Sequence, residues 1–565
     1  MEYIVFFAVI GGLLLIMFAK GTWDNYKLQQ RFIKHLYDDY GKQPDKEYKV
    51  ERFLRIGSYF DKHPVDGQID DITWNDLNMD EVFKRMNHTL SSTGEEYLYY
   101  TLRTPRLVKD ELEHQEELTA YFMEHDDERV KVQLLMNKLG STGNYSLYDY
   151  LDYLDVLGKR SNRSIMIRNL LLIALIGVCF VNLSVGMAAI VVLLVLNITT
   201  YFKDKKEIEP YIISFSYVMR LLDVCDRLVK VPVPVCSGEW EQIKAYRRKL
   251  GRMKQGSGWV LSGSAAVSSG NPLEIFMDYL NMAFHIDIMM FNKMLAELNH
   301  HLEDVDALIG IVGRVETAIC IGAYRASLKN GWCRPGLEQA DGEMYLTVKE
   351  AYHPLIDAPV KNSISTKRGV LLTGSNASGK STFLKTVALN AIMAQTIYTC
   401  TADSYEAPFF RIYSSMALKD DIGSGESYYI VEIKSLKRIL ENAGEEPILC
   451  FVDEVLRGTN TVERIAASTQ ILKSLGQGKV ICFAATHDIE LTELLKKEYE
   501  NYHFEEEIRD GDIFFNYQLL EGKATTRNAI RLLEIMGYEE DIIRQATQMA
   551  EHFTKAGVWE CGKQS

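Results

Sequence analysis

The sequence predicts an α/β fold joined to an all-helical region, with three membrane-spanning helices. Three observations predict it. Short apolar strands alternate with helical stretches between residues 369 and 488, charged amphipathic patterns fill residues 71–139 and 205–337, and uncharged apolar tracts occupy residues 3–19 and 169–202. The chain has 565 residues, more than the ~250 to 300 at which a single core stops growing, so we expect several domains.

The charge balance and the cysteines restrict the class of protein. The chain carries 63 basic and 77 acidic residues, a net charge of −14, which argues against a surface covered with nucleic-acid-binding groups, although local basic patches are compatible with it. Its nine cysteines include no C-x-x-C pair and show no regular spacing. We therefore expect reduced thiols that fill the core of a cytosolic body.

The first apolar tract, residues 3–19, is predicted to anchor the chain. Its 17 uncharged residues are just enough to cross the hydrocarbon layer of a membrane. A cleaved signal peptide is the alternative, but such a peptide starts with positive charge and ends in small residues, whereas this tract follows Glu2 and ends in Phe18, Ala19 and Lys20. We assign residues 1–20 to the anchor and residues 21–69 to a cytoplasmic linker helix.

The second apolar tract, residues 169–202, is predicted to form a membrane hairpin. Its 34 uncharged residues exceed one crossing, and Asn182, Ser184 and Gly186 suit a turn at its middle. A buried hairpin of a soluble core is the alternative. Basic residues flank both ends: Lys159, Arg160, Arg163, Arg168, Lys203, Lys205 and Lys206. The positive-inside rule then predicts a multi-pass protein of the cell membrane, with the hairpin at residues 166–203 and the rest of the chain after residue 20 in the cytoplasm.

Helical patterns on both sides of the hairpin predict an all-α core in two parts, residues 70–165 and 204–345. An apolar stripe at Met79, Val82, Phe83 and Met86 has helical spacing and is expected to pack inside this core. A basic cluster in the second part suits either a solvated helix face or contact with phosphate or anionic lipid; it comprises Lys244, Arg247, Arg248, Lys249, Arg252 and Lys254.

A glycine-rich loop follows the apolar strand 370–372. Gly374, Gly379, Lys380 and Ser381 have the spacing G-x-x-x-x-G-K-[ST], and the helical stretch 381–396 comes next. In such a loop the backbone N–H groups close around phosphates, the lysine reaches the β- and γ-phosphates, and the serine hydroxyl completes the shell of a Mg²⁺ ion. The sequence therefore predicts a nucleoside triphosphate site here.

Two later strands end in residues that suit hydrolysis. The apolar strand 448–452 is followed by Asp453, placed to hold Mg²⁺, and by Glu454, placed to polarise an attacking water. The strand 479–484 precedes His487, which is predicted to approach the γ-phosphate. Between the loop and these strands, Gly423, Ser424 and Gly425 open a helical run whose N–H groups suit an anion bound on a second subunit.

Taken together, these stretches resemble the MutS family of DNA mismatch-repair ATPases, relatives of the ABC ATPases. The similar segments are GSNASGKST, DDIGSGESYYIVE, CFVDEVLRGTN and FAATHD, and the resemblance extends more weakly from about residue 70 to residue 553. It implies a P-loop ATPase domain of ABC type at residues 346–555, followed by a tail at residues 556–565, and a MutS-like helical core before it.

The resemblance also implies roles for individual residues. The triphosphate-binding set is Gly374, Ser375, Asn376, Ala377, Ser378, Gly379, Lys380, Ser381 and Thr382. Ser381 and Asp453 would hold Mg²⁺, Glu454 and His487 would serve hydrolysis, and Gly425 with Ser427 would reach the ATP of a partner subunit in a homodimer.

Three departures from the family limit what the resemblance implies. Only about 70 residues precede the helical core, which leaves no room for a mismatch-sensing domain; no nuclease-like domain is expected after the ATPase; and the apolar tracts tie the chain to a membrane. We expect a membrane-anchored, dimeric ATPase whose nucleotide state moves two helical arms, with DNA as the candidate ligand. A membrane signalling or scaffold ATPase without DNA is the alternative; a transporter is disfavoured because the predicted spans carry no charge.

Overall fold

The computed structural model describes residues 20–24, 26–143, 146, 148–149, 160–251, 279–340, 342–375, 378–416, 428–444, 446–456, 459–509, 512–524 and 529–559. These residues form two compact units. The first comprises the described parts of Met1–Pro64, Met86–Tyr100 and Gln115–Ser327, and the second comprises those of Val65–Arg85, Thr101–His114 and Leu328–Ser565.

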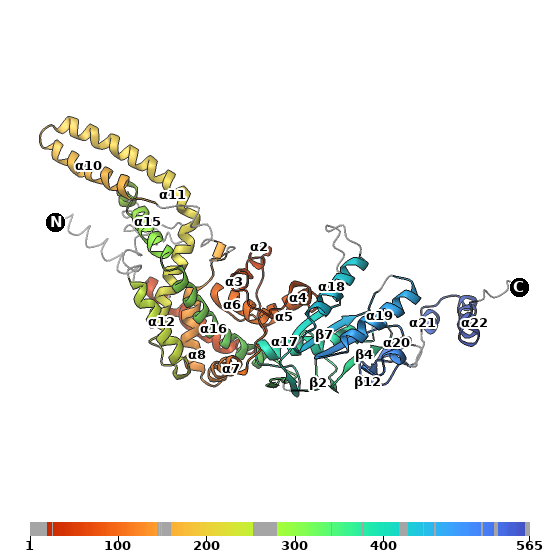
Figure 1. The fold of residues 1–565 in the computed structure, drawn as a ribbon. Coiled ribbons are helices and arrows are strands. Elements are labelled where there is room, and N and C mark those ends of the chain that lie inside the picture. The colour runs from red at the N-terminus through yellow and green to blue at the C-terminus, as the bar shows by residue number, and fades with distance from the viewer. Residues whose placement is uncertain are drawn as a thin grey trace. The chain divides into compact units, whose positions relative to one another are not determined.

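The first unit is helical throughout its described residues (Figure 1). Its elements are α2 (Val50–Phe53), α3 (Ser58–Lys62), most of α6 (Ser92–Arg103) and α7 (Lys109–Glu124), α8 (Asp126–Leu139), α10 (Arg163–Cys179), α11 (Leu183–Leu228), the 3₁₀ turn η1 (Pro234–Cys236), α12 (Ser237–Lys249), α15 (Ile286–Asn299) and α16 (Leu302–Ser327). The core lies where α8, α11, α12 and α16 meet, around Met136, Leu222, Ile243 and Val312. Helices α8 and α16 bury apolar faces in this core, as the sequence pattern predicts.

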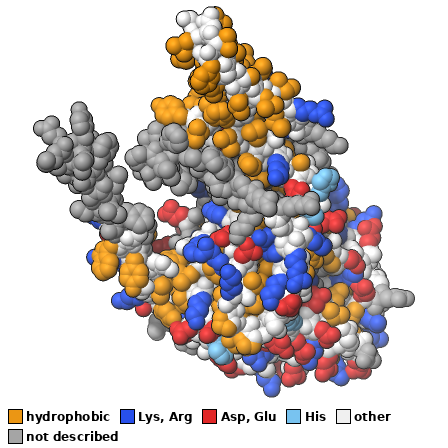
Figure 2. All heavy atoms as spheres, turned by 90° about the vertical axis from the view of Figure 1, so that its left-hand side faces the viewer, with side chains coloured by type: hydrophobic (Ala, Val, Ile, Leu, Met, Phe, Trp, Pro, Cys, Tyr) orange, Lys and Arg blue, Asp and Glu red, His pale blue; other side chains and the backbone are white. Residues whose placement is uncertain are grey.

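Helices α10 and α11 form an apolar hairpin, which we call the hairpin below. Asn182 ends the three-residue turn between them, and its side chain accepts a hydrogen bond from Val185 N at 3.2 Å, which caps α11. Large apolar side chains point outward along the hairpin, such as Ile173 (62% exposed) and Val192 (68% exposed). Figure 2 shows hydrophobic side chains gathered over it, at the top of that view. An exposed apolar surface of this kind is typical of a membrane or partner contact.

By length and composition, the described residues support one of the three predicted membrane spans. Among the described residues, one helical stretch, Leu183–Ile208, is long and apolar enough to cross a membrane, with a mean hydropathy of 2.2. Helix α10 has 17 residues, about 25 Å at 1.5 Å per residue, against ~30 Å for the hydrocarbon layer. The predicted anchor at residues 3–19 lies outside the described residues.

Asparagines at the base of the hairpin hold the segment that leads into α15. Asn197 Nδ2 donates to Ala283 O and Asn169 Nδ2 donates to Phe284 O, both at 2.8 Å. These carbonyls need partners because His285, at a φ of +55°, breaks the helical path just before α15. One side-chain amide from each hairpin helix therefore donates to a carbonyl at the end of the helical turn that precedes His285.

The second unit contains a mainly parallel six-stranded sheet in the order β12-β9-β4-β8-β7-β6. Its strands are β4 (Gly369–Thr373), β6 (Arg411–Ser415), β7 (Ile448–Asp453), β8 (Val480–Ala485), β9 (Tyr499–His503) and the antiparallel β12 (Leu520–Glu521). Helices α17 (Lys380–Thr396) and α19 (Thr461–Leu475) pack against β8, and α18 (Tyr428–Asn442) packs against β6. The central strands are fully buried, which matches their unbroken apolar sequences.

Further elements complete the second unit. A four-stranded sheet has the order β1-β5-β2-β3, and β10 and β11 form a hairpin of their own. The elements are α4 (Asp71–Asp76), most of α5 (Met79–Met86), β1 (Gly336–Glu338), β2 (Leu346–Ala351), β3 (Asn362–Thr366), β5 (Ser404–Pro408), β10 (Glu506–Arg509), β11 (Asp512–Phe515), α20 (Glu490–Leu494), α21 (Ala529–Ile535) and α22 (Glu540–Ala556). The predicted stripe on α5 is buried, and Phe83 is 0% exposed.

The short helix α4 is bonded to the sheet and to α18. Asp76 accepts from Ser414 Oγ at 2.7 Å and from Met416 N at 2.9 Å, and its side chain is buried. Asp70, which caps α4, lies 2.6 Å from Nη1 of Arg438 on α18. Helix α4 thus holds the chain on both sides of the stretch 417–427, which lies outside the described residues.

Candidate active site

The predicted phosphate loop lies between β4 and α17. Two of its glycines have backbone angles that favour glycine: φ is +141° at Gly374 and +110° at Gly379. A Cβ atom at Gly374 would lie 2.6 Å from the carbonyl oxygen of Phe504, so the loop can approach that backbone only without a side chain. These two positions, which the motif singled out, are therefore glycine for steric reasons.

Lys380 begins α17 and turns back into the loop. Its ammonium donates to the carbonyl oxygens of Gly374 and Ser375, both at 2.7 Å, and the side chain is buried. Burial lowers the pKa of Lys380, while the charges of Asp453 and Glu454 act in the opposite direction. Among the described residues this buried ammonium donates to carbonyl oxygens, and phosphate oxygens would give it stronger partners, so it is prepared for an anion.

Asp453 and Ser381 come together at the same edge of the sheet. Parallel pairing aligns Asp453 with Ala485, and Ala485 with Leu372, so the carboxyl ends of β7, β8 and β4 meet there. The Ser381 hydroxyl hydrogen-bonds Asp453, yet burial raises the pKa of that carboxyl above its usual range. A half-buried carboxylate beside a hydroxyl is a suitable oxygen donor set for Mg²⁺, whose charge would favour the ionised form.

Glu454 and His487 follow the ends of two neighbouring strands, and their side chains meet. The Oε1 atom of Glu454 lies 2.9 Å from Nε2 of His487. Glu454 has a φ of +58°, an uncommon angle for a residue with a side chain, and its N–H donates to Ala485 O at 3.0 Å. Backbone strain of this kind clusters at functional sites, and here it accompanies the carboxylate predicted to act on water.

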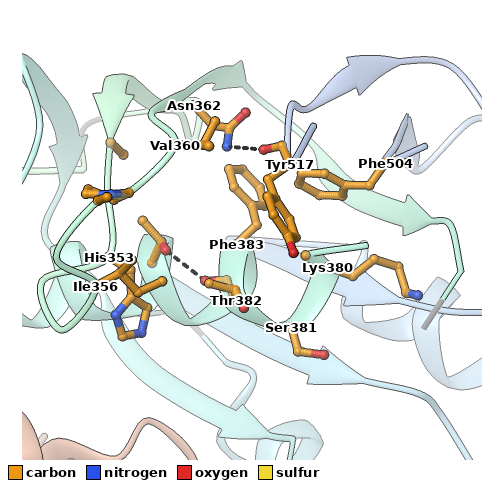
Figure 3. A pocket seen from close by; sticks show the side chains of 15 residues that line it. His353, Ile356, Val360, Asn362, Lys380, Ser381, Thr382, Phe383, Phe504 and Tyr517 are labelled. Atoms are coloured by element: carbon orange, nitrogen blue, oxygen red, sulfur yellow. Dashed lines mark hydrogen bonds between the residues drawn. The ribbon is translucent and has the colours of Figure 1, made fainter. Parts of the chain in front are cut away.

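A cavity of about 510 Å³ adjoins the start of α17 (Figure 3). Its lining joins residues from three parts of the chain: the segment 351–362, the first turns of α17, and the segment 504–517. Phe383, Phe504 and Tyr517 give it aromatic walls, and Lys380 and Ser381 lie at one side. Asn362 fixes the far wall, because its Nδ2 donates to Tyr517 O at 3.0 Å and its Oδ1 accepts from Leu519 N at 2.7 Å.

The cavity is neutral on the side away from the lysine. Burial and the charge of Lys385 lower the pKa of His353 to about 4, so its imidazole is uncharged near neutral pH. An aromatic, uncharged cavity next to a phosphate loop has the character of a site for a nucleoside base. Sequence reasoning missed this cavity. Part of its lining comes from the stretch EAYHPL at residues 350–355, which contributes Ala351 and His353.

Two loop contacts were also missed by the sequence reasoning. Ser375 Oγ donates to Glu506 Oε2 at 2.7 Å, and Ser378 Oγ donates to Ser375 O at 2.8 Å. The remaining predicted site residues are placed as follows: Thr382 lines the cavity, whereas Asn376, Ala377, Gly425 and Ser427 lie outside the described residues. Their predicted roles therefore stay predictions.

Comparisons with known proteins agree with this site. Residues 370–554 match the family model of MutS domain V. The DNA mismatch repair protein MutS of Thermus thermophilus is 31% identical over 225 residues, which cover 39% of this chain and 27% of that protein. MutS of Pseudothermotoga lettingae is 31% identical over 274 residues, 46% of this chain and 33% of that protein. MutS of Lactobacillus delbrueckii subsp. bulgaricus is 29% identical over 289 residues, 49% of this chain and 33% of that protein.

The matched stretch spans about a third of the length of these relatives or less. It contains the phosphate loop, Asp453, Glu454 and His487. The resemblance predicted from the sequence motifs is therefore confirmed for the C-terminal half of the chain, which is related to MutS proteins through their domain V.

Proposed function

We propose that this chain is a membrane-anchored ATPase of the MutS type, which binds ATP with Mg²⁺ and hydrolyses it in a site completed by a second copy. One observation carries the proposal: the loop lysine Lys380, the acids Asp453 and Glu454, and His487 meet at one edge of the parallel sheet. That edge is where open α/β sheets bind their ligands. Hydrolysis then drives the opening and closing of helical arms.

The residues at this edge fit ATP and Mg²⁺. Burial lowers the pKa of Lys380 and raises that of Asp453, so each charged form is disfavoured without a partner of opposite sign. A triphosphate and a divalent cation supply those partners. When bound, Mg²⁺ neutralises part of the charge on the phosphates.

The side chains at this edge have separate roles in the proposed reaction. Lys380 would bind the β- and γ-phosphates, and the loop N–H groups would orient them. Glu454 would accept a proton from the attacking water, and His487, 2.9 Å away, holds that carboxylate in place. In this assignment Glu454 acts on the reaction directly, whereas His487 positions it.

A first prediction concerns the aromatic cavity as the site of the adenine. Replacing Tyr517 by alanine should weaken ATP binding about tenfold, because stacking of a base on an aromatic ring contributes ~1–3 kcal/mol. The ring is 44% exposed and lies above the start of α17, so its loss should not disturb the fold (Figure 3). Calorimetric titration with ATP measures the change.

Two controls make this measurement specific. Tyr517→Phe keeps the ring and should bind ATP as the wild type does. Inorganic triphosphate, which has no base, should bind the wild type and Tyr517→Ala equally. Equal loss of ATP and of triphosphate would show that the ring supports the loop and not the base.

A second prediction concerns the dimer, and it depends on Ser427, whose placement rests on the sequence alone. Ser427→Ala chains keep the phosphate loop, and Lys380→Ala chains keep the Ser427 segment, so each homodimer should be nearly inactive. A mixed dimer combines one intact loop with one intact Ser427, and its turnover should recover to as much as about half of wild type. Turnover is measured on mixed dimers isolated through two affinity tags.

The control for this experiment is a mixed dimer in which both substitutions lie in the same chain, beside a wild-type partner. In this dimer the intact loop of the wild-type chain faces the Ser427→Ala position of its partner, and the intact Ser427 faces the Lys380→Ala loop. Neither site is complete, so the dimer should stay inactive. If the isolated mixed dimer of single variants gave no recovery, Ser427 would act within its own subunit or the two sites would fire only together.

A third prediction concerns the membrane. The basic residues at both ends of the hairpin support a topology with its turn, residues 180–182, on the outer side and residues from 203 onward in the cytoplasm. An impermeant thiol reagent added to intact cells should label a cysteine placed at Asn182, and not one placed at Lys206. Both sites should react after the cells are opened. Labelling of the Lys206 site in intact cells would refute this orientation.

DNA is the proposed ligand of the helical arms, on the strength of the MutS likeness. Binding of the detergent-solubilised dimer to duplex, mismatched and branched DNA at two salt concentrations tests it. A protein that neutralises several phosphates loses affinity steeply as salt rises. The absence of binding at low salt would favour a membrane signalling or scaffold ATPase, in keeping with the net charge of −14.

A further inference from the structure

A second cavity lies at the base of the hairpin, far along the sequence from the phosphate loop. It has a volume of about 480 Å³ and is lined by residues from the first turns of α10 and from the middle of α11: Ser164, Ile167, Arg168, Thr200, Lys203 and Asp204. These positions lie where the apolar tract gives way to charged residues. If the hairpin enters a membrane, the cavity lies at the level of the lipid headgroups.

The two cations of this cavity differ from their basic neighbours. Arg160 is paired with Glu207 at 2.5 Å, and Lys205 donates to Tyr201 Oη at 2.7 Å. By contrast, the hydrogen bond that Arg168 makes within the described chain joins its Nη1 to Thr200 Oγ1 at 2.5 Å, a neutral partner. Lys203 is exposed and forms no ion pair with any described residue. The cavity is therefore lined by two cations, one from each helix, that form no ion pair with any described residue.

The rest of the lining favours an amphiphilic anion. Asp204 also lines the cavity, so the three charged groups leave one net positive charge. Ile167 lines it as well and is 58% exposed, and the outward apolar residues Leu170 (64%) and Leu171 (51%) follow on α10. A free phosphate would use the cations and leave this apolar exit unused. A phospholipid would use both.

We propose that this cavity binds the headgroup of an anionic glycerophospholipid, with phosphatidylglycerol as the probe. Arg168, Lys203 and the Ser164 hydroxyl bind the phosphodiester, Asp204 accepts hydrogen bonds from the glycerol hydroxyls, and an acyl chain follows the apolar face that starts at Ile167. The inference rests on the proposed membrane insertion and names the lipid class that the hairpin selects.

Native mass spectrometry of the full-length chain in mild detergent tests the proposal. The wild type should retain one phosphatidylglycerol and no phosphatidylcholine at equal lipid concentration. Lys203→Gln removes one charged contact and should lower the affinity about tenfold, the effect of losing a hydrogen bond to a charged group. Lys206→Gln removes the same charge from a residue that does not line the cavity, and it should retain the lipid.

Each other outcome overturns the inference in a distinct way. Equal loss in Lys203→Gln and Lys206→Gln would show a general attraction of charge and no headgroup site. Competition by millimolar glycerol 3-phosphate would identify a site for free phosphate esters. A wild type that needs detergent for extraction yet retains no phosphatidylglycerol would remove this site and leave the membrane proposal intact. A wild type recovered without detergent would remove the membrane proposal itself.

Discussion

Lys380→Ala is expected to abolish ATP binding and turnover. The ammonium is buried and held 2.7 Å from the carbonyl oxygens of Gly374 and Ser375, within the loop that surrounds the phosphates. Hydrogen bonds to charged groups contribute ~1.5–3 kcal/mol each, so the loss of contacts to two phosphates should lower ATP affinity by roughly 10² to 10⁴. Equilibrium binding of a fluorescent ATP analogue and release of phosphate measure the two effects.

The alanine variant should fold normally. Burial lowers the pKa of Lys380, so the charged ammonium is disfavoured in the ligand-free chain and its removal costs little there. Lys367→Ala is the matched control, because it removes an exposed lysine just before β4 that pairs with Glu343. It should bind and hydrolyse ATP as the wild type does. Normal hydrolysis by Lys380→Ala would refute the site assignment.

Glu454→Ala is expected to separate binding from chemistry. Glu454 faces His487, and Lys380 remains to bind the phosphates, so ATP should stay bound while hydrolysis slows by on the order of 10² or more, the range for losing a general base. Single-turnover hydrolysis of prebound ATP gives the chemical rate, and equilibrium binding gives the affinity.

Two further variants distinguish proton acceptance by Glu454 from its positioning by His487. Glu454→Gln keeps the shape and the left-handed backbone position but cannot accept the proton, so it should be as slow as the alanine variant. His487→Ala should have a smaller effect, since that side chain positions the carboxylate. A fall in ATP affinity with an unchanged rate for bound ATP would show that Glu454 binds the nucleotide and does not activate water.

The parts of the site that the sequence predicted depend on short-range patterns. A glycine-rich loop follows one apolar strand, and an acid and a histidine follow two further strands. These residues can be placed together because parallel strands end at one edge of the sheet. The structure brings Lys380, Asp453 and His487 to that edge. The family comparison supports the same half of the chain.

The rest of the site depends on contacts between distant segments. The cavity joins His353, Phe383 and Tyr517, which are separated by up to 164 positions and share no pattern. Its walls follow from the path of β3 and from the β10–β11 hairpin, which periodicity does not reveal. Glu506, the partner of Ser375, was missed for the same reason.

Helical segments of both units show the same division. The amphipathic stripe of α5 was predicted to pack inside, and its Met79 and Met86 are buried, because side-chain period alone decides which face is apolar. The break at His285 was not predicted. It depends on Asn169 and Asn197, which supply the amide donors from another part of the chain.

The contacts of α4 determine which fragments of the chain can fold. A fragment that started at Leu328 would keep the whole phosphate loop but would lose Asp70 and Asp76. Ser414, the N–H of Met416 and Arg438 would then lose their carboxylate partners, at ~1–3 kcal/mol for each group left buried and unsatisfied. The nucleotide-binding half is therefore not an autonomous folding unit. Its compact unit also includes residues 65–85 and 101–114, so proteolytic dissection should release these segments and the nucleotide-binding half as one non-covalent body.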